Sequence, residues 1–448
     1  MHTATSPART SATSGARRHG TPAASDPNLA SIARKVANGR RLSIEDGAAL
    51  YATPDTWSVC ALADLVRRRM HGDIAYYNVN RHLNYSNVCA LSCTFCSFYR
   101  KAGQDGAYEH SIDQIREEAA AAAAAGATEI HIVGGLHPHL PFDYYTEMLR
   151  AITAVAPRLH IKAFTAVEIV HFARISKRGR DKYEGLKAVL RDLVAAGLGS
   201  LPGGGAEVFD DRVHDRAFKG KIRAGTWLDV HRAAHELGLN TNATMLYGHI
   251  ESRAERIRHM DILRRQQDRT LGEWARDSGI GLQSGDAVVL TGPPELYPGP
   301  RLPEAGRCRR GFFQAIIPLP FIPDDSSLQH LPGPTGLENL RTIAVARLML
   351  DNFPHVKAFW IMQTLELAQF MLLNGADDID GTVVWYDITK VGTTSTHQET
   401  TAWDLQRAIR EAGLRPVERD TLYRPIDRDG NTWRVSTPAE CPAQLRHP

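Results

Sequence analysis

Residues 128–166 read TEIHIVGGLHPHLPFDYYTEMLRAITAVAPRLHIKAFTA. This stretch begins with a short apolar run over 128–134 and ends with a second run over 160–166. An amphipathic helical pattern over 142–156 separates the two runs. A strand, a helix and a strand in this order are the repeating unit of a parallel sheet.

The same alternation continues on both sides of this unit, over residues 76–385. Further strands are predicted at 76–84, 198–203, 240–247, 311–319, 355–362 and 379–384. Further helices are predicted at 113–125, 183–196, 226–237, 253–268 and 337–351. Eight strands alternating with helices favour an α/β fold of the (β/α)8, TIM-barrel type. A doubly wound open sheet shows the same alternation, so the periodicity alone does not exclude it.

The segments outside this alternation complete the predicted organisation of the chain. The first part is rich in Ser, Thr, Ala, Pro and Arg, which is typical of a disordered leader. The long segment between the fifth helix and the sixth strand is rich in Pro and Gly and is interpreted as an insertion loop. The predicted divisions are a leader 1–27, a helical segment 28–75, a barrel 76–390 with the insertion 271–310, and a C-terminal helix with a polar tail 391–448.

The composition excludes several classes of protein. The net charge of +3 is small for 448 residues, which argues against a protein built mainly to bind nucleic acid. No stretch approaches the roughly 20 apolar residues of a membrane-spanning helix. The N-terminal part lacks the apolar core of a secretory signal, so we expect a cytoplasmic protein.

The cysteines are unevenly distributed along the chain. The six cysteines are Cys60, Cys89, Cys93, Cys96, Cys308 and Cys441. Three of them crowd into eight residues and the others are scattered, which is not the pattern of a disulfide framework.

The clustered cysteines have the spacing Cys-x3-Cys-x2-Cys, directly after the first predicted strand. Cysteine thiolates are the usual ligands of iron–sulfur clusters, and three of them leave one iron of a [4Fe–4S] cluster open. An open metal position can bind a substrate. A structural zinc site is the alternative, with His82 or His110 as the fourth ligand, and three unrelated buried cysteines are another.

The cysteine spacing resembles the signature of the radical S-adenosylmethionine superfamily. The resemblance implies a [4Fe–4S] cluster held by Cys89, Cys93 and Cys96, with S-adenosylmethionine bound to the fourth iron through its amino and carboxylate groups. It implies reductive cleavage of S-adenosylmethionine to methionine and a 5′-deoxyadenosyl radical. It also implies an electron donor such as flavodoxin or ferredoxin.

Longer segments resemble one family within this superfamily, the aminofutalosine synthases of the futalosine route to menaquinone. The segments are HIVGGLHPHLPFDYYTE (131–147), HIKAFTAVEI (160–169), PGGGAEVF (202–209), TNATMLYGHIE (241–251) and ADDIDGTVV (376–384). The resemblance spans about residues 40–270 and 311–423. It implies a transferase in which the radical adds to the enol-ether double bond of 3-[(1-carboxyvinyl)oxy]benzoate and gives 6-amino-6-deoxyfutalosine, methionine and carbon dioxide.

Candidate site residues follow from these motifs and from the positions of predicted strand ends. The resemblance implies that the cofactor contacts Phe98, Gly134, Gly135, Gly203, Gly204, Gly205 and Glu207. Active sites of barrels lie at the C-terminal ends of the strands. Candidates for binding the substrate or moving a proton are His137, Lys162, Glu168, Thr244, His249, Glu251 and Arg81. His131 lies inside an apolar strand and is interpreted as a core histidine.

Two other functions stay open at this point. A sister enzyme of the same superfamily, the cyclic dehypoxanthinyl futalosine synthase, abstracts hydrogen and closes a ring. A non-catalytic iron–sulfur or zinc module would use the cysteines for structure, sensing or electron transfer.

Overall fold

The computed structural model describes residues 26–27, 29–277, 287, 289–290, 310–383 and 399–436. Nearly all of the predicted leader and most of the predicted insertion lie outside the described residues, as do Cys308 and Cys441.

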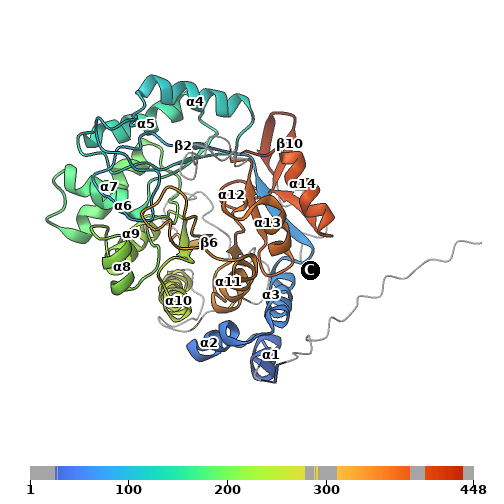
Figure 1. Ribbon diagram of the computed structural model, residues 1–448. Coiled ribbons are helices and arrows are strands. Elements are labelled where there is room, and N and C mark those ends of the chain that lie inside the picture. Colours follow the sequence, from blue (N-terminus) through green and yellow to red (C-terminus); the bar gives the residue numbers. More distant parts are fainter. Residues whose placement is uncertain are drawn as a thin grey trace, which may run out of the picture.

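Eight extended segments form a closed barrel of parallel strands (Figure 1). In chain order they are β1 (Ile74–Asn78) with β2 (Asn80–Leu83), β3 (Glu129–Ile132), β4 (His160–Ala163), a bridge segment at Ser200 and Leu201, β5 (Thr241–Tyr247), β6 (Phe313–Pro320), β7 (His355–Val356) and β8 (Asp378–Gly381). The predicted (β/α)8 fold is therefore confirmed.

Parallel pairing runs all the way round this barrel. Regular ladders join β2 to β3, β3 to β4, β5 to β6 and β6 to β7, and β8 pairs with β1. The fourth segment is joined to its neighbours by isolated parallel bridges, Lys162 with Ser200 and Leu201 with Thr241. A further bridge from Lys357 to Asp378 connects the seventh and eighth strands and completes the ring.

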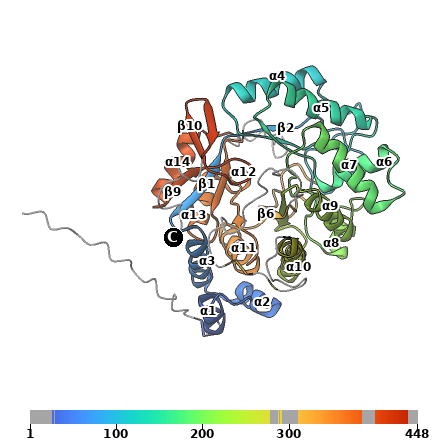
Figure 2. The same ribbon diagram turned by 180° about the vertical axis from the view of Figure 1, so that it is seen from behind.

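Helices surround the barrel on its outer side, as both views show (Figures 1 and 2). They are α4 (Ile112–Ala124), α5 (Phe142–Val155), α6 (Ala166–Ile175), α7 (Lys182–Ala196), α8 (Asp211–Ala217), α9 (Ala224–Glu236), α10 (Arg253–Asp277), α11 (Gly336–Met349), α12 (Trp360–Gln363), α13 (Leu365–Leu372) and α14 (Ala402–Glu411). The predicted N-terminal helical segment contains α1 (Leu29–Ala37), α2 (Ile44–Ala52) and α3 (Thr56–His71), and α3 packs against α11.

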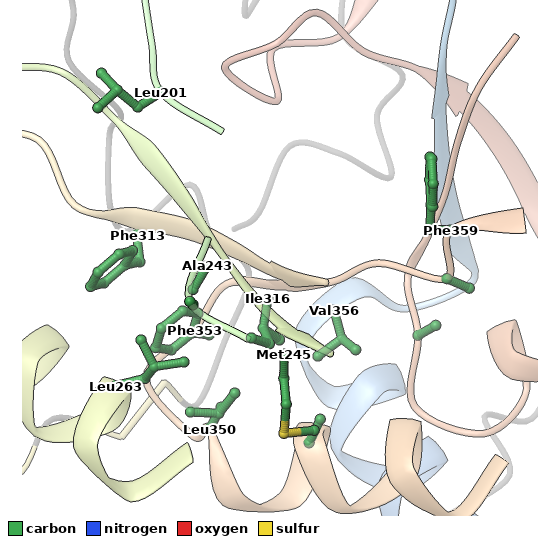
Figure 3. Close-up of a cluster of buried hydrophobic side chains, with 14 of the residues drawn as sticks. Leu201, Ala243, Met245, Leu263, Phe313, Ile316, Leu350, Phe353, Val356 and Phe359 are labelled. Atoms are coloured by element: carbon green, nitrogen blue, oxygen red, sulfur yellow. The ribbon is translucent and has the colours of Figure 1, made fainter. Parts of the chain in front are cut away.

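The apolar core lies between the strands and the helices. Along each strand, alternate side chains point outward to the helices. Figure 3 shows Met245 of β5, Ile316 of β6 and Val356 of β7 on the side of the strands that faces Leu263 of α10. All four side chains are fully buried. The other alternate positions point into the barrel, where polar residues such as Asn242 and Thr244 lie beside apolar ones such as Ile317 and Leu319.

Two predicted strands are shorter than expected. The strand predicted at 198–203 is reduced to its two bridges, because Pro202 and the following glycines cannot sustain a ladder. The strand predicted at 355–362 ends at Val356, and α12 begins at Trp360. A short apolar run is compatible with a buried strand or a buried helix, so periodicity did not separate the two.

The described part of the predicted polar tail forms three strands, which the prediction did not include. β9 (Arg415–Glu418) pairs in parallel with β1, and β10 (Ile426–Asp429) pairs with β11 (Thr432–Val435) in an antiparallel hairpin. These strands are charged, so they carry no apolar run. The two-residue loop Gly430-Asn431 between the last two strands is a hairpin signal that was not used in the prediction.

Described residues of the predicted insertion pack against the rest of the chain. Leu290 is buried against Met70, Leu271 and Phe312, and its N–H donates to the carbonyl of Asp351 at 2.8 Å. Within the described residues, no helix is both long enough and apolar enough to cross a membrane.

A buried ion pair links the C-terminal strands to the barrel. Arg419, which follows β9, is 1% exposed, and its Nε lies 2.6 Å from Oδ2 of Asp378 in β8. Removal of one partner leaves the other charge buried and uncompensated. We therefore expect Arg419→Met to lower the free energy of unfolding by about 3–5 kcal/mol in urea titrations.

The control is Arg407→Met, because Arg407 is a half-exposed residue of α14 that pairs with Asp404 at 3.4 Å. This change should alter stability by less than about 1 kcal/mol. Equal effects of the two substitutions would contradict the importance of the buried pair.

Candidate active site

One cavity of about 310 Å³ opens inside the barrel, at the C-terminal ends of its strands. This volume is within the usual range for small-molecule sites. Its wall includes Cys89, Cys93 and Cys96 at one end and polar residues of the barrel interior at the other. We call the first the cysteine end and the second the floor, which is formed by His82, His131, Lys162, Asn242, Lys357 and Asp380.

The cysteine loop follows β2, and backbone contacts fix its course. The N–H of Cys89 donates to the carbonyl of Arg100 at 2.9 Å, and that of Ala90 donates to Leu136 at 2.9 Å. The N–H of Leu136 in turn lies 3.4 Å from Sγ of Cys89. The loop is therefore held against the segment that follows β3.

Lys101 holds the same loop from its exposed side. Its Nζ donates to three consecutive carbonyls, those of Cys89 at 3.0 Å, Ala90 at 3.3 Å and Leu91 at 2.8 Å. Three carbonyls that point at one ammonium must lie on the same side of the chain, so this contact fixes the turn that carries the first cysteine.

The three thiols suit a metal cluster better than a single ion. Zinc holds its thiolates at about 2.3 Å, so the sulfurs around it lie close together. Among the described residues, only His71, His355 and Asp377 bring three possible ligand atoms within 4.8 Å of one another. The thiols of the loop are spread more widely around the cavity, as the ligands of a cluster of several irons must be.

Burial raises the pKa of the Cys93 thiol to about 11 and raises that of Cys96 as well. A buried thiolate needs a nearby cation, and a coordinated metal deprotonates a thiol outright. The donor set therefore fits an iron–sulfur cluster.

The two histidines considered as a fourth zinc ligand have other contacts in the structure. His110 pairs with Glu118, with Nδ1 and Oε1 3.2 Å apart. His82 lies in the floor, where its ring packs against that of His131 at a tilt of 35°, with centroids 4.6 Å apart. No described histidine completes a site with the three cysteines.

The cluster of His71, His355 and Asp377 lies apart from the cavity and is explained by buried ion pairing. His355 Nδ1 lies 2.6 Å from Asp377 Oδ2, and Arg347 also binds this carboxylate. Burial lowers the pKa of His71 to about 3. Arg347 binds Oδ1 of Asp377 while both histidines face Oδ2, so this carboxylate is already paired within the protein.

Glycines form the rim between the cysteine end and the strands. A Cβ on Gly135 would lie 2.3 Å from the carbonyl oxygen of Val88, so only glycine allows the two loops to approach this closely. Gly205 has a φ of +88°, and a Cβ there would lie 2.4 Å from Val167. Both glycines and the neighbouring Gly134, Gly203 and Gly204 line the cavity, as the sequence predicted for a ligand-binding rim.

Glu207 and Phe98 also line the cavity, and Glu207 forms an ion pair with Lys221. Burial opposes the charge of Lys221, but Glu207 raises the pKa of this ammonium. Lys221 lines the same cavity and its Nζ lies 5.0 Å from the centre of the Phe95 ring. A fixed positive charge therefore lies beside the cysteine end, at a residue that no sequence motif singled out.

Glu168 is buried and joins three parts of the rim. Its Oε1 accepts from the hydroxyl of Tyr85 at 2.8 Å and from the N–H of Gly134 at 3.2 Å. Its Oε2 accepts from the N–H and the hydroxyl of Thr165, the N-cap of α6. Burial raises the pKa of Glu168 to about 7, although these hydrogen bonds favour the charged carboxylate and act in the opposite direction. Its sequence signal is the capping box Thr165-x-x-Glu168.

The floor contains two buried ion pairs. Lys162 Nζ lies 2.7 Å from Glu129 Oε1, and Lys357 Nζ lies 2.9 Å from Asp380 Oδ1. Burial would raise the pKa of Glu129, but the two ammonium groups hold it well below its usual value. Thr244 of β5 lines the cavity beside the floor and donates to the carbonyl of Gly203 at 2.7 Å.

Four candidates from the sequence do not line the cavity, namely His137, His249, Glu251 and Arg81. His137 pairs with Glu109 at 2.9 Å and accepts from two backbone N–H groups. Glu251 accepts from the N–H groups of Gly248 and His249, and also from Arg256. These residues order their own loops, which is a structural role.

Arg81 points away from the barrel interior, because β2 alternates and its neighbours Asn80 and His82 point inward. It lines a separate outer hollow together with Thr382 and Glu399. His131, interpreted from sequence as a core histidine, instead contributes to the floor. Lys357, Asp380 and Asn242 are further floor residues that the sequence analysis did not single out.

The comparisons with known proteins agree with this geometry. A family model described as the radical SAM superfamily matches residues 83–263, and one described as the CofH/MqnC C-terminal region matches residues 309–431. The fold resembles that of methylornithine synthase, with a TM-score of 0.61 at 15% identity, over 86% of this chain and 96% of that structure. With the relatives described next, these matches show that the chain belongs to the radical S-adenosylmethionine superfamily, whose members use a [4Fe–4S] cluster and S-adenosylmethionine.

Within this superfamily, the chain is similar to enzymes of more than one name. The chain is 41% identical to the aminodeoxyfutalosine synthase of Thermus thermophilus over 405 residues, which cover 90% of this chain and 96% of the relative. It is also 41% identical to the enzyme of that name from Streptomyces coelicolor, over 88% of this chain and 92% of the relative. It is 34% identical to a 5-amino-6-(D-ribitylamino)uracil–L-tyrosine 4-hydroxyphenyl transferase of Methanosphaerula palustris, over 88% and 98%.

The cysteine assignment can be tested by iron analysis. We expect Ser at Cys89, Cys93 or Cys96 to abolish activity and reduce the iron bound after anaerobic reconstitution, because each substitution removes one thiolate ligand. Cys60→Ser is the control, since Cys60 is buried in α3, outside the cavity. Loss of iron in the Cys60 variant and its retention in the Cys93 variant would overturn the assignment.

The role of Lys101 in ordering the cysteine loop can be tested separately. Lys101→Met should loosen the loop by about 1 kcal/mol, because it removes charge-assisted hydrogen bonds at an exposed position. Amide hydrogen exchange over residues 89–96 should become roughly fivefold faster in the iron-free protein. Lys182→Met, at an exposed position of α7, should leave exchange in this loop unchanged. Unchanged exchange in the Lys101 variant would show that the loop is held by other contacts.

Proposed function

We propose that the chain is an aminodeoxyfutalosine synthase, a radical enzyme of the futalosine route to menaquinone. Its substrates are S-adenosylmethionine and 3-[(1-carboxyvinyl)oxy]benzoate, and its products are 6-amino-6-deoxyfutalosine, methionine and carbon dioxide. The observation that carries the proposal is the 41% identity to enzymes of this name over nearly the whole chain.

In this proposal Cys89, Cys93 and Cys96 hold the cluster at the cysteine end of the cavity. When bound, the cluster supplies the electron that cleaves S-adenosylmethionine to methionine and the 5′-deoxyadenosyl radical. That electron comes from outside the chain, from a donor such as flavodoxin or ferredoxin. The proposed partners include no nucleic acid, in keeping with the small net charge of +3.

The chain's own residues bind and orient S-adenosylmethionine at the rim. The backbone at Gly134-Gly135 and at Gly203–Gly205 can approach a ligand closely, because no Cβ atoms stand in the way. Glu207 places a carboxylate at the same rim, where it can accept a hydrogen bond from a ribose hydroxyl or the amino group, while Glu168 fixes the backbone of Gly134. Phe98 offers a flat apolar face beside the last cysteine.

The barrel protects the radical and positions its target. The reaction adds the 5′ carbon to the enol-ether double bond, and the aryl group then migrates from the ether oxygen to the neighbouring carbon. The C–C bond to the carboxyl group breaks to give the ketone and carbon dioxide, and the unpaired electron returns to the electron-transfer partner that supplied it. An addition of this kind needs the two carbons held at roughly 3–3.5 Å. The enclosing strands exclude water, which would otherwise favour side reactions of the intermediates.

The fate of the adenosyl carbons tests the proposal. With S-adenosylmethionine that carries ¹³C in its ribose, we expect the label in an aryl-ketone nucleoside identified by mass spectrometry. Free 5′-deoxyadenosine should be a minor product of uncoupled cleavage, because addition keeps the adenosyl unit in the product.

The control reaction omits the enol-ether substrate and should give labelled 5′-deoxyadenosine without the aryl-ketone nucleoside. If the complete reaction returned all of the label as 5′-deoxyadenosine beside an unlabelled modified product, the enzyme would abstract hydrogen instead. That result would assign the chain to the ring-closing sister enzymes.

A further inference from the structure

A short sequence pattern occurs twice in the barrel and places two lysines inside it. Residues 160–164 read HIKAF, and residues 355–359 read HVKAF. The first lies on the third strand of the barrel and the second on the seventh. In a closed barrel of eight strands, strands four positions apart lie on opposite walls. Lys162 and Lys357 therefore enter the cavity from opposite sides.

Both lysines are buried and yet lie at the cavity wall. Each is 3% exposed, and each makes one hydrogen bond to a side chain, to Glu129 or to Asp380. An ammonium group has three N–H donors. Each lysine thus keeps two donors for a further partner, and the two acids neutralise the lysines while that partner is absent.

The other floor residues are polar but carry no positive charge. Burial lowers the pKa of His82 to about 4 and holds that of His131 well below its usual value, so both imidazoles are neutral at pH 7. Asn242 lines the same floor, and its Oδ1 has no hydrogen-bond partner among the described residues. Asp380 has a φ of +72°, a strained backbone conformation for a non-glycine residue. Strain of this kind is common at ligand-binding sites.

We propose that Lys162 and Lys357 together bind the ring carboxylate of an aryl substrate at the floor of the barrel. This inference rests on the proposed function for the identity of the substrate. The carboxylate accepts N–H donors from both lysines, while Glu129 and Asp380 keep their present contacts. Two cations on opposite walls favour an anionic group that lies between them, at the centre of the barrel. The carboxylate of a benzoate ring is narrow enough to lie there.

This anchor fixes the orientation of the substrate in the cavity. The reacting 5′ carbon belongs to a ligand held at the cysteine end, so the vinyl group must point there. The ring carboxylate is meta to the ether oxygen and lies at the opposite end of the molecule. A substrate held by this carboxylate therefore presents its double bond toward the cysteine end, and the carboxylate that is lost remains near the rim.

Binding of unreactive ring fragments tests the anchor directly. The probes are 3-methoxybenzoate and its neutral amide, 3-methoxybenzamide, measured by calorimetry with the reconstituted enzyme. We expect the wild type to bind the acid roughly 10- to 100-fold more tightly than the amide, as for hydrogen bonds to a charged group. In Lys357→Met and in Lys162→Met this preference should fall to within about threefold of unity.

Three further variants separate recognition from folding. Lys357→Arg keeps the cation and should retain part of the preference for the acid. The double variant Lys357→Met/Asp380→Asn removes both charges of one pair, which avoids an uncompensated buried carboxylate if the single variant does not fold. Lys182→Met removes a cation from the exposed surface of α7 and should leave the preference unchanged.

The outcomes distinguish this inference from the proposed function. A preference for the acid that persists in folded variants at both lysines would overturn the anchor, and so would a wild type that binds the two probes equally. If labelled nucleoside still formed from the complete substrate, the proposed function would stand without the anchor. If the wild type preferred the acid and both lysine variants lost that preference, but no nucleoside formed, the anchor would stand and the synthase assignment would fail.

Discussion

Closure of the barrel through its first strand is the constraint on which the site depends. The β1–β2 strand pairs with β8 at its beginning and with β3 at its end. At the junction, the carbonyl of Asn78 accepts from Thr382 at 3.2 Å, and Oδ1 of Asn80 accepts from the N–H of Val383 at 2.8 Å. Because β2 leads directly into the cysteine loop, this pairing brings the two ends of the barrel sequence to one cavity.

The interior of the barrel differs from the layer outside it in the way it is stabilised. The outer layer is apolar, and alternate strand residues such as Met245 and Ile316 bury their side chains against the helices. The interior buries charges, which are tolerated only when they are paired and hydrogen-bonded. The pairs Lys162–Glu129 and Lys357–Asp380 meet that requirement. A polar floor is costly for stability but gives a cavity that can recognise a charged ligand.

The sequence predicted the parts of the fold that depend on apolar runs, and it missed those that depend on pairing alone. Seven of the eight predicted strands have short apolar runs, and these seven form ladders. The strands β9 to β11 are charged, so they can be recognised only from their pairing in the structure. The family resemblance supplied the glycine rim, which lines the cavity as expected. Position at a strand end was a weaker guide, because it does not fix where a side chain points. His249 and Glu251 therefore order their own loop, while Lys357 was overlooked although HVKAF repeats the HIKAF pattern around Lys162.

Glu168 shows why the rim cannot be divided into structural and functional residues. One oxygen of its carboxylate accepts from the N–H of Thr165, the N-cap of α6, and so stabilises the start of this helix. The other oxygen accepts from the hydroxyl of Tyr85 and from the N–H of Gly134. The start of a helix, the loop after β2 and the end of β3 are thus joined at one buried group. A ligand that contacts the rim meets backbone atoms whose positions this carboxylate has already fixed. Preorganisation of this kind lowers the entropic cost of binding, because the loops are ordered before the ligand arrives.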